Sequence, residues 1–442
     1  MESRNGQQAA SGTEVESHTT FLRQGSWLVV ATVAGGVFMM GTQVVAQHWM
    51  VPGEYVVFCA LLRVFLLMGI PSAGLQTVFA QQTASAVTAE QRLVLAATVR
   101  AVLAATLVVW CVIGAVTAFA QETWVTRLKI GNPAALWVTV MIGLAALWLP
   151  VFKGVLQGRQ RFAGLGWTLI LDGVGRFLSV TVLLWLGGQA AGGMTGALLG
   201  QLAALVVGVW LLRHLVLDSG RGFRWGPWLR RVVPFSLGAG SIVFISNADV
   251  VYVQSIFHVD QTTLYMPAAM IGVALVCVTT PLAAVMFPKV ARSAALTRGT
   301  HAVQLALGAT ALLGALAALA CTAFPKLPLQ IIYVGSPQYW AAAPLVPWFA
   351  WALVPLIVAN VLLGNLLARE RFGVVPWVTL LVVAYGVTLV WLRPHLLAFA
   401  EPLDAFRCVL GTLGGYNLLL LAVTVFFTFR EKVPVGAGEP AA

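Results

Sequence analysis

The stretch EYVVFCALLRVFLLMGIPSAGLQ, residues 54–76, is long and apolar enough to cross a membrane, yet it carries Arg63 near its middle. A transmembrane helix needs about 20 mostly apolar residues to cross a hydrocarbon core about 30 Å thick. Similar runs recur along all 442 residues, of which 60% are hydrophobic and 9% are charged. Soluble domains are about 25% charged. The composition therefore predicts a polytopic, all-α integral membrane protein.

Twelve apolar runs of membrane-spanning length can be placed along the chain. Each is far longer than the roughly 10 residues of a membrane-spanning strand, so each is expected to be a helix. The five cysteines lie within or beside these runs without C-x-x-C spacing, which indicates buried thiols rather than disulfides or metal ligands. The expected spans are 24–49, 54–80, 93–120, 134–156, 163–187, 192–213, 231–256, 263–287, 301–324, 340–367, 372–392 and 405–429.

The basic residues, which give a net charge of +11, predict the orientation of the spans. If the N-terminus is cytoplasmic, 18 of the 26 Lys and Arg fall in inner segments and four in outer loops. The positive-inside rule then places both termini in the cytoplasm. The rule also accounts for the basic charge without a nucleic acid partner. The basic and aromatic stretch RGFRWGPWLRR, residues 221–231, is expected at the cytoplasmic membrane interface.

The sequence contains an internal repeat. Tyr55 precedes Pro71 by sixteen residues, and Tyr265 precedes Pro281 by the same number. Both pairs occupy the second span of a six-span half. The halves would share one orientation, as parallel repeats do. This pattern predicts two six-helix lobes around a central cavity, with Pro71 and Pro281 as candidate hinges because proline removes a helical hydrogen bond.

The repeat also defines the expected domain boundaries. The basic stretch lies in the longest connection between spans and divides the chain at its middle. The expected segments are a cytoplasmic tail 1–22, an N-terminal lobe 23–215, a cytoplasmic linker 216–230, a C-terminal lobe 231–430 and a cytoplasmic tail 431–442.

Arginines inside the expected spans are candidates for substrate binding. An Arg at the centre of a membrane helix costs about 2.5–3.5 kcal/mol on insertion scales, so it is expected to face protein or a hydrated cavity. Arg63 and Arg176 lie deepest, Arg100 lies about a third of the way along its span, and Arg407 lies near the outer end of the last span. Guanidinium groups bind phosphate and carboxylate through charge-assisted hydrogen bonds, so these residues favour an anionic substrate.

Two acids accompany these arginines. Asp172 precedes Arg176 by one helical turn, so the two either form a neutralising ion pair or share a substrate role. Asp249 lies in the seventh span beside Asn247. Because burial makes the charge of a carboxyl group depend on access, Asp249, Asn247 and Asp172 are candidates for proton or sodium coupling. Asp249 is equally compatible with a role as partner to one of the arginines.

Motifs for catalysis do not occur in the sequence. It contains no G-x-x-x-x-G-K-[ST] phosphate loop, no H-E-x-x-H zinc motif and no G-x-S-x-G nucleophile elbow. The six histidines are scattered, and no sizeable extramembrane domain separates the spans. These features favour transport over catalysis, with no metal and no cofactor beyond a coupling ion.

Two stretches resemble the polysaccharide flippases of the multidrug/oligosaccharidyl-lipid/polysaccharide exporter superfamily. GVLQGRQRFAGLGWTLILDGVGRFLSVTVLLWLGG, residues 154–188, resembles their fourth and fifth spans, where a GxxRF-like turn leads into a helix that carries an Arg. NADVVYVQSIFHVDQTTLYMPAAMIGVALVCVTTPLAAVMFPKVARS, residues 247–293, resembles their seventh and eighth spans.

The resemblance implies a flippase that moves an undecaprenyl-diphosphate-linked oligosaccharide across a bacterial inner membrane. It implies that Arg176 and Arg63 bind the head group. Arg176 is assigned this role because its position matches the family's Arg, and Arg63 because of the span it lies in. Lipid II flippases of the superfamily usually have fourteen spans, so a chain with twelve points to surface polysaccharide. The implied partners are membrane lipids, the lipid-linked oligosaccharide and other polysaccharide assembly proteins.

Two alternatives remain open from the sequence. The chain is also compatible with a drug or small-metabolite antiporter of the same superfamily. It is compatible, too, with a non-transporting scaffold of a polysaccharide assembly complex, in which case changes near residues 213–231 would matter more than changes to the membrane arginines.

Overall fold

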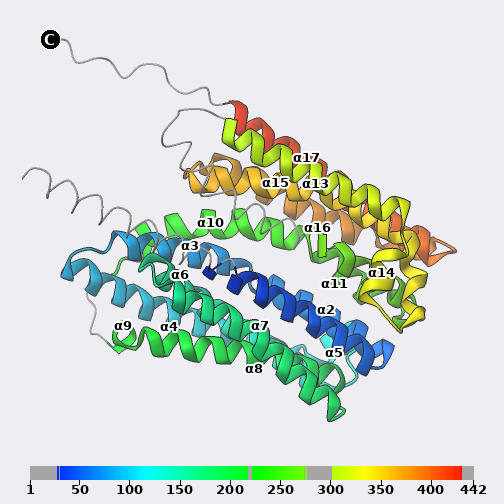
Figure 1. Cartoon of the computed structure of the whole chain (residues 1–442), viewed down its shortest axis with the longest axis horizontal. Helices are drawn as coiled ribbons and strands as arrows, with labels where there is room; N and C mark the ends of the chain where they lie inside the picture. The colour runs from blue at the N-terminus through cyan, green and yellow to red at the C-terminus, as the bar shows by residue number, and fades with distance from the viewer. Residues whose placement is uncertain (1–26, 29, 218–221, 273, 276–300, 431–442) are drawn as a thin grey trace, which may run out of the picture. The chain divides into compact units, whose positions relative to one another are not determined.

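The computed structural model describes residues 27–28, 30–217, 222–272, 274–275 and 301–430, and all regular secondary structure in these ranges is helical (Figure 1). Within these ranges, nine helices are long and apolar enough to cross a membrane, or ten if one bent pair counts as a span. The expectation of an all-α membrane protein with about twelve spans is confirmed. Pro281, one of the two candidate hinges, lies outside the described residues, as does much of the expected span 263–287.

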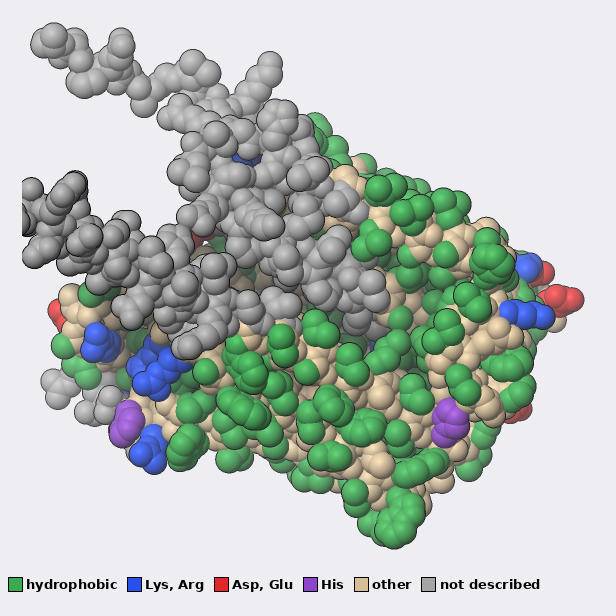
Figure 2. All heavy atoms as spheres, in the orientation of Figure 1, with side chains coloured by type: hydrophobic (Ala, Val, Ile, Leu, Met, Phe, Trp, Pro, Cys, Tyr) green, Lys and Arg blue, Asp and Glu red, His purple; other side chains and the backbone are tan. Residues whose placement is uncertain are grey.

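Hydrophobic side chains cover most of the described surface seen in Figure 2, whereas charged side chains gather toward the helix ends. Large apolar residues such as Trp185, Val206 and Trp210 are more than half exposed. Exposed apolar surface of this extent marks a surface that meets lipid or a partner. In this chain it lies on helices of membrane-spanning length, so lipid is the partner it fits.

The chain forms two compact units. The first contains residues 1–236 and 254–263, and the second contains residues 237–253 and 264–442. In the first unit, α6 is the central helix, and it packs against α2, α3, α4, α7 and α8. The helices of this unit are Val30–Trp49, α2 (Pro52–Met68), α3 (Ile70–Ser85), α4 (Ala89–Phe119), α5 (Gln121–Leu128), α6 (Ala134–Gly158), α7 (Phe162–Trp185), α8 (Gln189–Leu211) and α9 (Arg213–Leu217).

In the second unit, α15 is the central helix, and it packs against α13 and α17. The seventh expected span, α10 followed by α11, begins in the first unit, enters the second after Ser236 and leaves it again after Val253. The elements are α10 (Trp225–Ile245), α11 (Ala248–Ile256), a helix over 259–272, α13 (His301–Ala323), α14 (Leu327–Ile332), η1 (Pro337–Leu345), α15 (Val346–Ala368), η2 (Phe372–Val374), α16 (Val375–Ala398) and α17 (Pro402–Arg430).

The two halves repeat one packing pattern. In each, the fourth span (α6 or α15) packs against the third (α4 or α13) and the sixth (α8 or α17), and the fifth and sixth pack together. Tyr55 and Tyr265, which match in the sequence repeat, are both fully buried. Tyr265 contacts Phe349 of α15 and Phe406 of α17, and α2 contacts the equivalent helices α6 and α8. The repeat in the sequence therefore corresponds to a repeat in packing.

Two expected spans are broken helices. Span 54–80 bends by 42° between α2 and α3, at Gly69 and just before Pro71. Proline favours the first turn of a helix, which suits a new helix that starts there. Span 231–256 is interrupted at 246–247, where Ser246 and Asn247 donate side-chain hydrogen bonds of 2.6 and 2.7 Å to carbonyls one turn earlier. Such bonds compete with helical ones and explain the break.

The end of the seventh span is held by the segment that follows α5 in the first unit. Lys129 Nζ donates to the Gln254 carbonyl at 3.3 Å, and Gln254 Nε2 donates to the Leu128 carbonyl at 3.2 Å. Lys129 adopts a left-handed conformation with φ of 55°, which ends α5. Its partial burial lowers the pKa of its ammonium group. These bonds explain why residues 254–263 group with the first unit.

Glycines bring α7 and α8 into backbone contact. A Cβ added at Gly200 of α8 would overlap the backbone of Arg176, whose Cα would lie 2.6 Å away, and one at Gly196 would overlap Val180. A Cβ at Gly173 of α7 would overlap the backbone of Gly35. Small residues at such positions let membrane helices approach closely. The segment of α7 around Arg176 is therefore fixed by its neighbours.

We expect Gly200→Ala to destabilise the protein by about 1–3 kcal/mol, because overpacking forces backbone shifts. Gly114→Ala is the matched control, since nothing lies within 4 Å of a Cβ added at Gly114 in α4. The control should match the wild type or exceed it slightly, because Ala favours a helix over Gly. Thermal denaturation of both purified variants in detergent measures the difference. Equal melting temperatures would contradict the close α7–α8 packing.

Candidate functional site

Three charged side chains are buried in the described part of the chain: Arg63, Arg176 and Asp249. Arg63 and Arg176 belong to the first unit and are each 5% exposed. Asp249 belongs to the second unit and is 1% exposed. Because burial of a charge is costly unless it is paired, each of these positions is a candidate for function. Neither deep arginine faces lipid.

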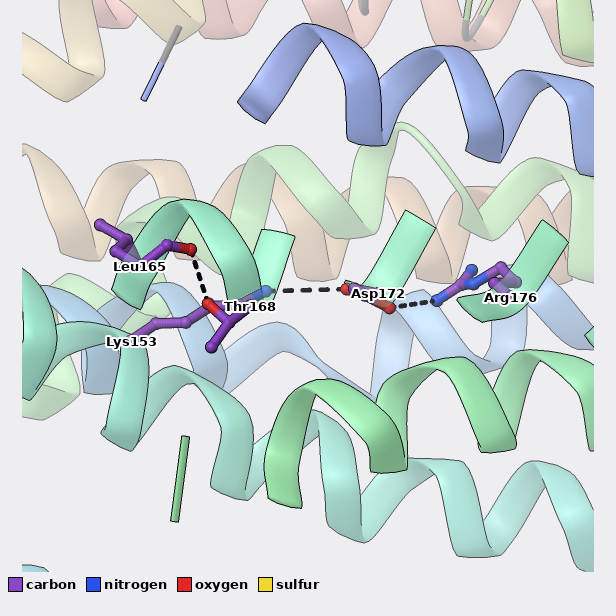
Figure 3. A network of polar contacts seen from close by, with 5 residues as sticks. All are labelled: Lys153, Leu165, Thr168, Asp172 and Arg176. Carbon is purple, nitrogen blue, oxygen red and sulfur yellow. Dashed lines mark hydrogen bonds and ion pairs between the residues drawn. The ribbon is translucent and has the colours of Figure 1, made fainter. Parts of the chain in front are cut away.

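Asp172 of α7 lies between two cations (Figure 3). Its Oδ1 is 3.3 Å from Nη2 of Arg176, one turn farther along α7, and its Oδ2 is 3.6 Å from Nζ of Lys153 on α6. The Asp172–Arg176 ion pair, one of the two alternatives that the sequence left open, is thus present. A second cation shares the same carboxylate, so the cluster Lys153–Asp172–Arg176 carries a net charge of +1.

The guanidinium group of Arg176 is held from several directions. Gly200 places the α8 backbone against the backbone of Arg176. The ring of Phe65 on α2 lies 5.7 Å from the Arg176 guanidinium carbon, within the range of a cation–π contact. The Nε atom of Arg176 is buried and has no hydrogen-bond partner. The side chain is therefore positioned and desolvated, and one of its donors is unused.

Lys153 is a site residue that sequence reasoning missed. Its position near the end of the fourth expected span is typical of a basic residue at the membrane surface, but its side chain is 13% exposed and points to Asp172. One signal was present in the sequence. The α6–α7 turn at 159–161 is short, so the two helices are antiparallel neighbours, and a long Lys side chain near the end of α6 can reach an acid on α7.

The other candidate arginines lie in different surroundings. Arg63 lies on α2, close enough to Cys59 to interact electrostatically with its thiol. Arg100 is half-buried on α4. Arg407, in the second unit, is 41% exposed and pairs with Asp404 at 2.9 Å. The Asp404–Arg407 pair is therefore a half-exposed ion pair near the start of α17, unlike the covered cluster in the first unit.

Asp249 lies in the first turn of α11, directly after the break in the seventh span. The hydroxyl of Tyr265 donates to its Oδ2 at 2.6 Å. Tyr385 of α16 is fully buried and close enough to interact with the Asp249 charge. Asn247 lies two residues before Asp249, and its side-chain amide donates to the Val243 carbonyl. The second unit thus contains a buried acid held by a tyrosine hydroxyl.

The repeat is not symmetric at Asp249. This residue precedes Tyr265 by sixteen positions, and the residue sixteen positions before Tyr55 is Met39. The first half therefore has no acid at the matched position, while its own buried charges are cations.

Among the described residues, no group of three or more His, Cys, Asp or Glu could hold a metal ion. A hollow of about 460 Å³ beside Lys326 and Trp340 in the second unit includes none of the candidate residues.

The fold is shared with solved transporters of the MOP superfamily. An inward-facing MATE multidrug resistance transporter of that superfamily matches with a TM-score of 0.64 and 13% identity, over 89% of this chain and 93% of that chain. The lipid II flippase MurJ in an inward closed conformation matches with a TM-score of 0.64 and 10% identity, over 91% of this chain and 87% of that chain. A MOP superfamily transporter from Pyrococcus furiosus, described as having a binding pocket of reverse polarity that suggests a different function, matches with a TM-score of 0.61 and 13% identity, over 92% and 94%.

No family model and no curated protein matches the chain. At 10–13% identity, the structural likeness establishes the fold alone. The chain shares its fold with these proteins, which are transporters and a flippase rather than enzymes. The narrower resemblance to polysaccharide flippases stays a prediction.

Proposed function

We propose that this protein flips a polyprenyl-diphosphate-linked oligosaccharide outward across a bacterial inner membrane, for surface polysaccharide biosynthesis. The two units would alternate the access of the cargo between the two sides. The cationic side chains of the first unit would hold the diphosphate head, while the polyprenyl tail stays in lipid. Membrane lipids, the lipid-linked oligosaccharide and polysaccharide assembly proteins are the proposed partners.

One observation supports this proposal most strongly. The first unit covers Arg176 and Lys153 with protein and places one carboxylate, Asp172, between them. Buried positive charge in excess of negative charge is costly unless an anion offsets it. A diphosphate provides that charge, and its oxygens accept the hydrogen bonds that guanidinium and ammonium groups donate. The likeness of fold to a lipid II flippase is compatible with such a cargo.

Asp249 is the proposed ion-coupling residue. Asp249 lies in the second unit, far in sequence from the cationic cluster. It is in the first turn of α11, directly after the break at 246–247. A buried acid whose access to water changes during transport would bind and release a proton or sodium ion. Asn247 would supply a neutral oxygen at the same site. Pro71, at the 42° bend between α2 and α3, is the proposed hinge of the first unit.

Cargo selection by the purified chain in proteoliposomes tests the proposal. We expect transfer between leaflets of a fluorescent polyprenyl-diphosphate oligosaccharide, and little transfer of a matched glycolipid without phosphate. We expect no transport of a cationic dye such as ethidium, because the buried charge in the first unit is positive. Transport of the dye without movement of the diphosphate lipid would contradict the proposal.

That contrary result would favour the second candidate function, a drug or small-metabolite antiporter. The specific observation in its favour is the match to MATE multidrug transporters over about nine-tenths of the chain. The buried acid Asp249 would also suit a cation. The net positive charge around Arg176 is the reason that an anionic cargo is the first choice.

A further inference from the structure

The carboxylate of Asp172 occupies the place that an anion would take between Lys153 and Arg176. Its two oxygens are directed to different cations, one from α6 and one from α7 (Figure 3). The distances of 3.6 and 3.3 Å exceed the 2.7–2.9 Å typical of charge-assisted hydrogen bonds. Asp172 therefore pairs with both cations, offsets one of their two positive charges and binds neither one tightly.

The cluster is incomplete without a further acceptor. Arg176 is 5% exposed, and its buried Nε has no hydrogen-bond partner. A buried donor left unsatisfied costs free energy, the more so when it carries charge. A second acid that could complete the cluster is absent from the surrounding helices that the structure describes. The spans Val30–Trp49 and α8 contain no Asp or Glu, α6 contributes Lys153, and α2 contributes Arg63 and, at its outer end, Glu54.

Asp172 is also the most accessible member of the cluster. Its side chain is 17% exposed, against 13% for Lys153 and 6% for Arg176. Arg176 is fixed by backbone contact with Gly200 and by the ring of Phe65. An arriving anion would therefore meet a fixed guanidinium group and, beside it, the more exposed carboxylate of Asp172. A phosphate group offers more oxygens and more charge than one carboxylate, so it can replace the carboxylate at both cations.

We infer that Asp172 is an exchangeable counter-ion: it holds Lys153 and Arg176 while the site is empty, and a diphosphate head displaces it from both. This inference rests on the proposed function and adds Lys153 as a head-group ligand. Cargo and Asp172 compete for the same two cations. Asp172 thus lowers the affinity for the anion, offsets half of the positive charge of the empty cluster and helps to release the head after transfer.

Binding of farnesyl diphosphate to the full chain in detergent, measured by calorimetry, tests the inference. Asp172→Asn keeps the shape of the side chain and removes its charge. We expect it to tighten binding about tenfold, the effect of roughly one charge-assisted contact. The matched control is Asp404→Asn, which removes the acid of the half-exposed pair with Arg407 and should leave binding unchanged. Farnesol, which lacks the diphosphate, should bind Asp172→Asn and the wild type equally.

A double-mutant cycle separates competition from a structural role. In the wild type, Lys153 is already paired with Asp172, so Lys153→Met should weaken the binding of farnesyl diphosphate by only a few-fold. In the Asp172→Asn background, Lys153 is available to the diphosphate, so the same change should weaken binding about tenfold more than in the wild type. Inorganic pyrophosphate serves as a second probe. If Asp172→Asn raises the affinity for farnesyl diphosphate more than the affinity for pyrophosphate, the site binds a lipid-linked anion. If it raises both affinities equally, the site binds a free anion.

One result would contradict the proposed function, and a different result would contradict the exchange of Asp172 alone. If the wild type and all variants fail to bind either diphosphate, the proposed function itself is wrong. If the wild type binds but Asp172→Asn binds equally or more weakly while its melting temperature is unchanged, Asp172 orients Arg176 and is not exchanged. If Asp172→Asn fails to fold, Asp172→Ser with the same two probes replaces it, under the same criteria.

Discussion

Arg176→Ala is expected to weaken binding of farnesyl diphosphate on the order of 100-fold and to stop transfer of the diphosphate-linked cargo. Truncation of one member of a buried, hydrogen-bonded charge pair costs about 2–5 kcal/mol, and each 1.4 kcal/mol is a factor of ten. The substitution removes a guanidinium group that is 5% exposed and has a buried donor still available. Calorimetry in detergent and transfer between leaflets in proteoliposomes measure the two effects.

The control for this prediction is Arg407→Ala. That side chain is 41% exposed and pairs locally with Asp404, and exposed ion pairs contribute little. Its removal should change neither binding nor transfer by more than a few-fold. Arg176→Ala must also retain its helical content and melt cooperatively, so that loss of binding is not loss of fold. Wild-type affinity in a folded Arg176→Ala variant would show that the diphosphate does not bind this cluster.

The second large effect is expected at Asp249. Asp249→Asn should abolish stimulation of transport by an ion gradient while leaving diphosphate binding in place, because the residue is remote in sequence from the cationic cluster and lies in the other unit. The amide cannot exchange a proton near neutral pH or offer a charged oxygen to sodium. Removal of a buried charge should not destabilise the fold, since the Tyr265 hydroxyl can still donate to the amide oxygen.

Asp260→Asn is the matched control, since Asp260 is an exposed acid at the start of the following helix, 259–272. Transport should be measured in proteoliposomes under an imposed proton gradient and, separately, a sodium gradient. The gradient that stimulates the wild type identifies the ion. Undiminished stimulation in Asp249→Asn would assign coupling to another residue.

The sequence was sufficient to predict the helices and one contact of the candidate site. Membrane-length apolar runs predicted the helices because a backbone in lipid must satisfy its hydrogen bonds within each segment. The one-turn spacing of Asp172 and Arg176 gave their ion pair as one of two alternatives, since such pairs depend on local helical geometry alone. The matched Tyr55 and Tyr265 predicted equivalent positions, and both side chains are fully buried.

Features that depend on contacts between helices could not be predicted in the same way. Lys153 reaches Asp172 across the α6–α7 turn, and its position near a helix end is equally typical of a lysine at the headgroup layer. The donation from Tyr265 to Asp249 joins residues on two helices, which the one-dimensional pattern does not pair. The break at 246–247 depends on side chains that turn back to their own helix, which hydropathy does not detect.

The central claim is that the covered cations of the first unit hold an anionic lipid head. The most direct measurement is surface polysaccharide in the native host after deletion of its own copy, with the deletion complemented by wild-type protein or by the Arg63→Ala/Arg176→Ala double variant at equal abundance in the membrane. The wild type is predicted to restore the polysaccharide and the double variant to leave it absent. Full restoration by the double variant would contradict the claim.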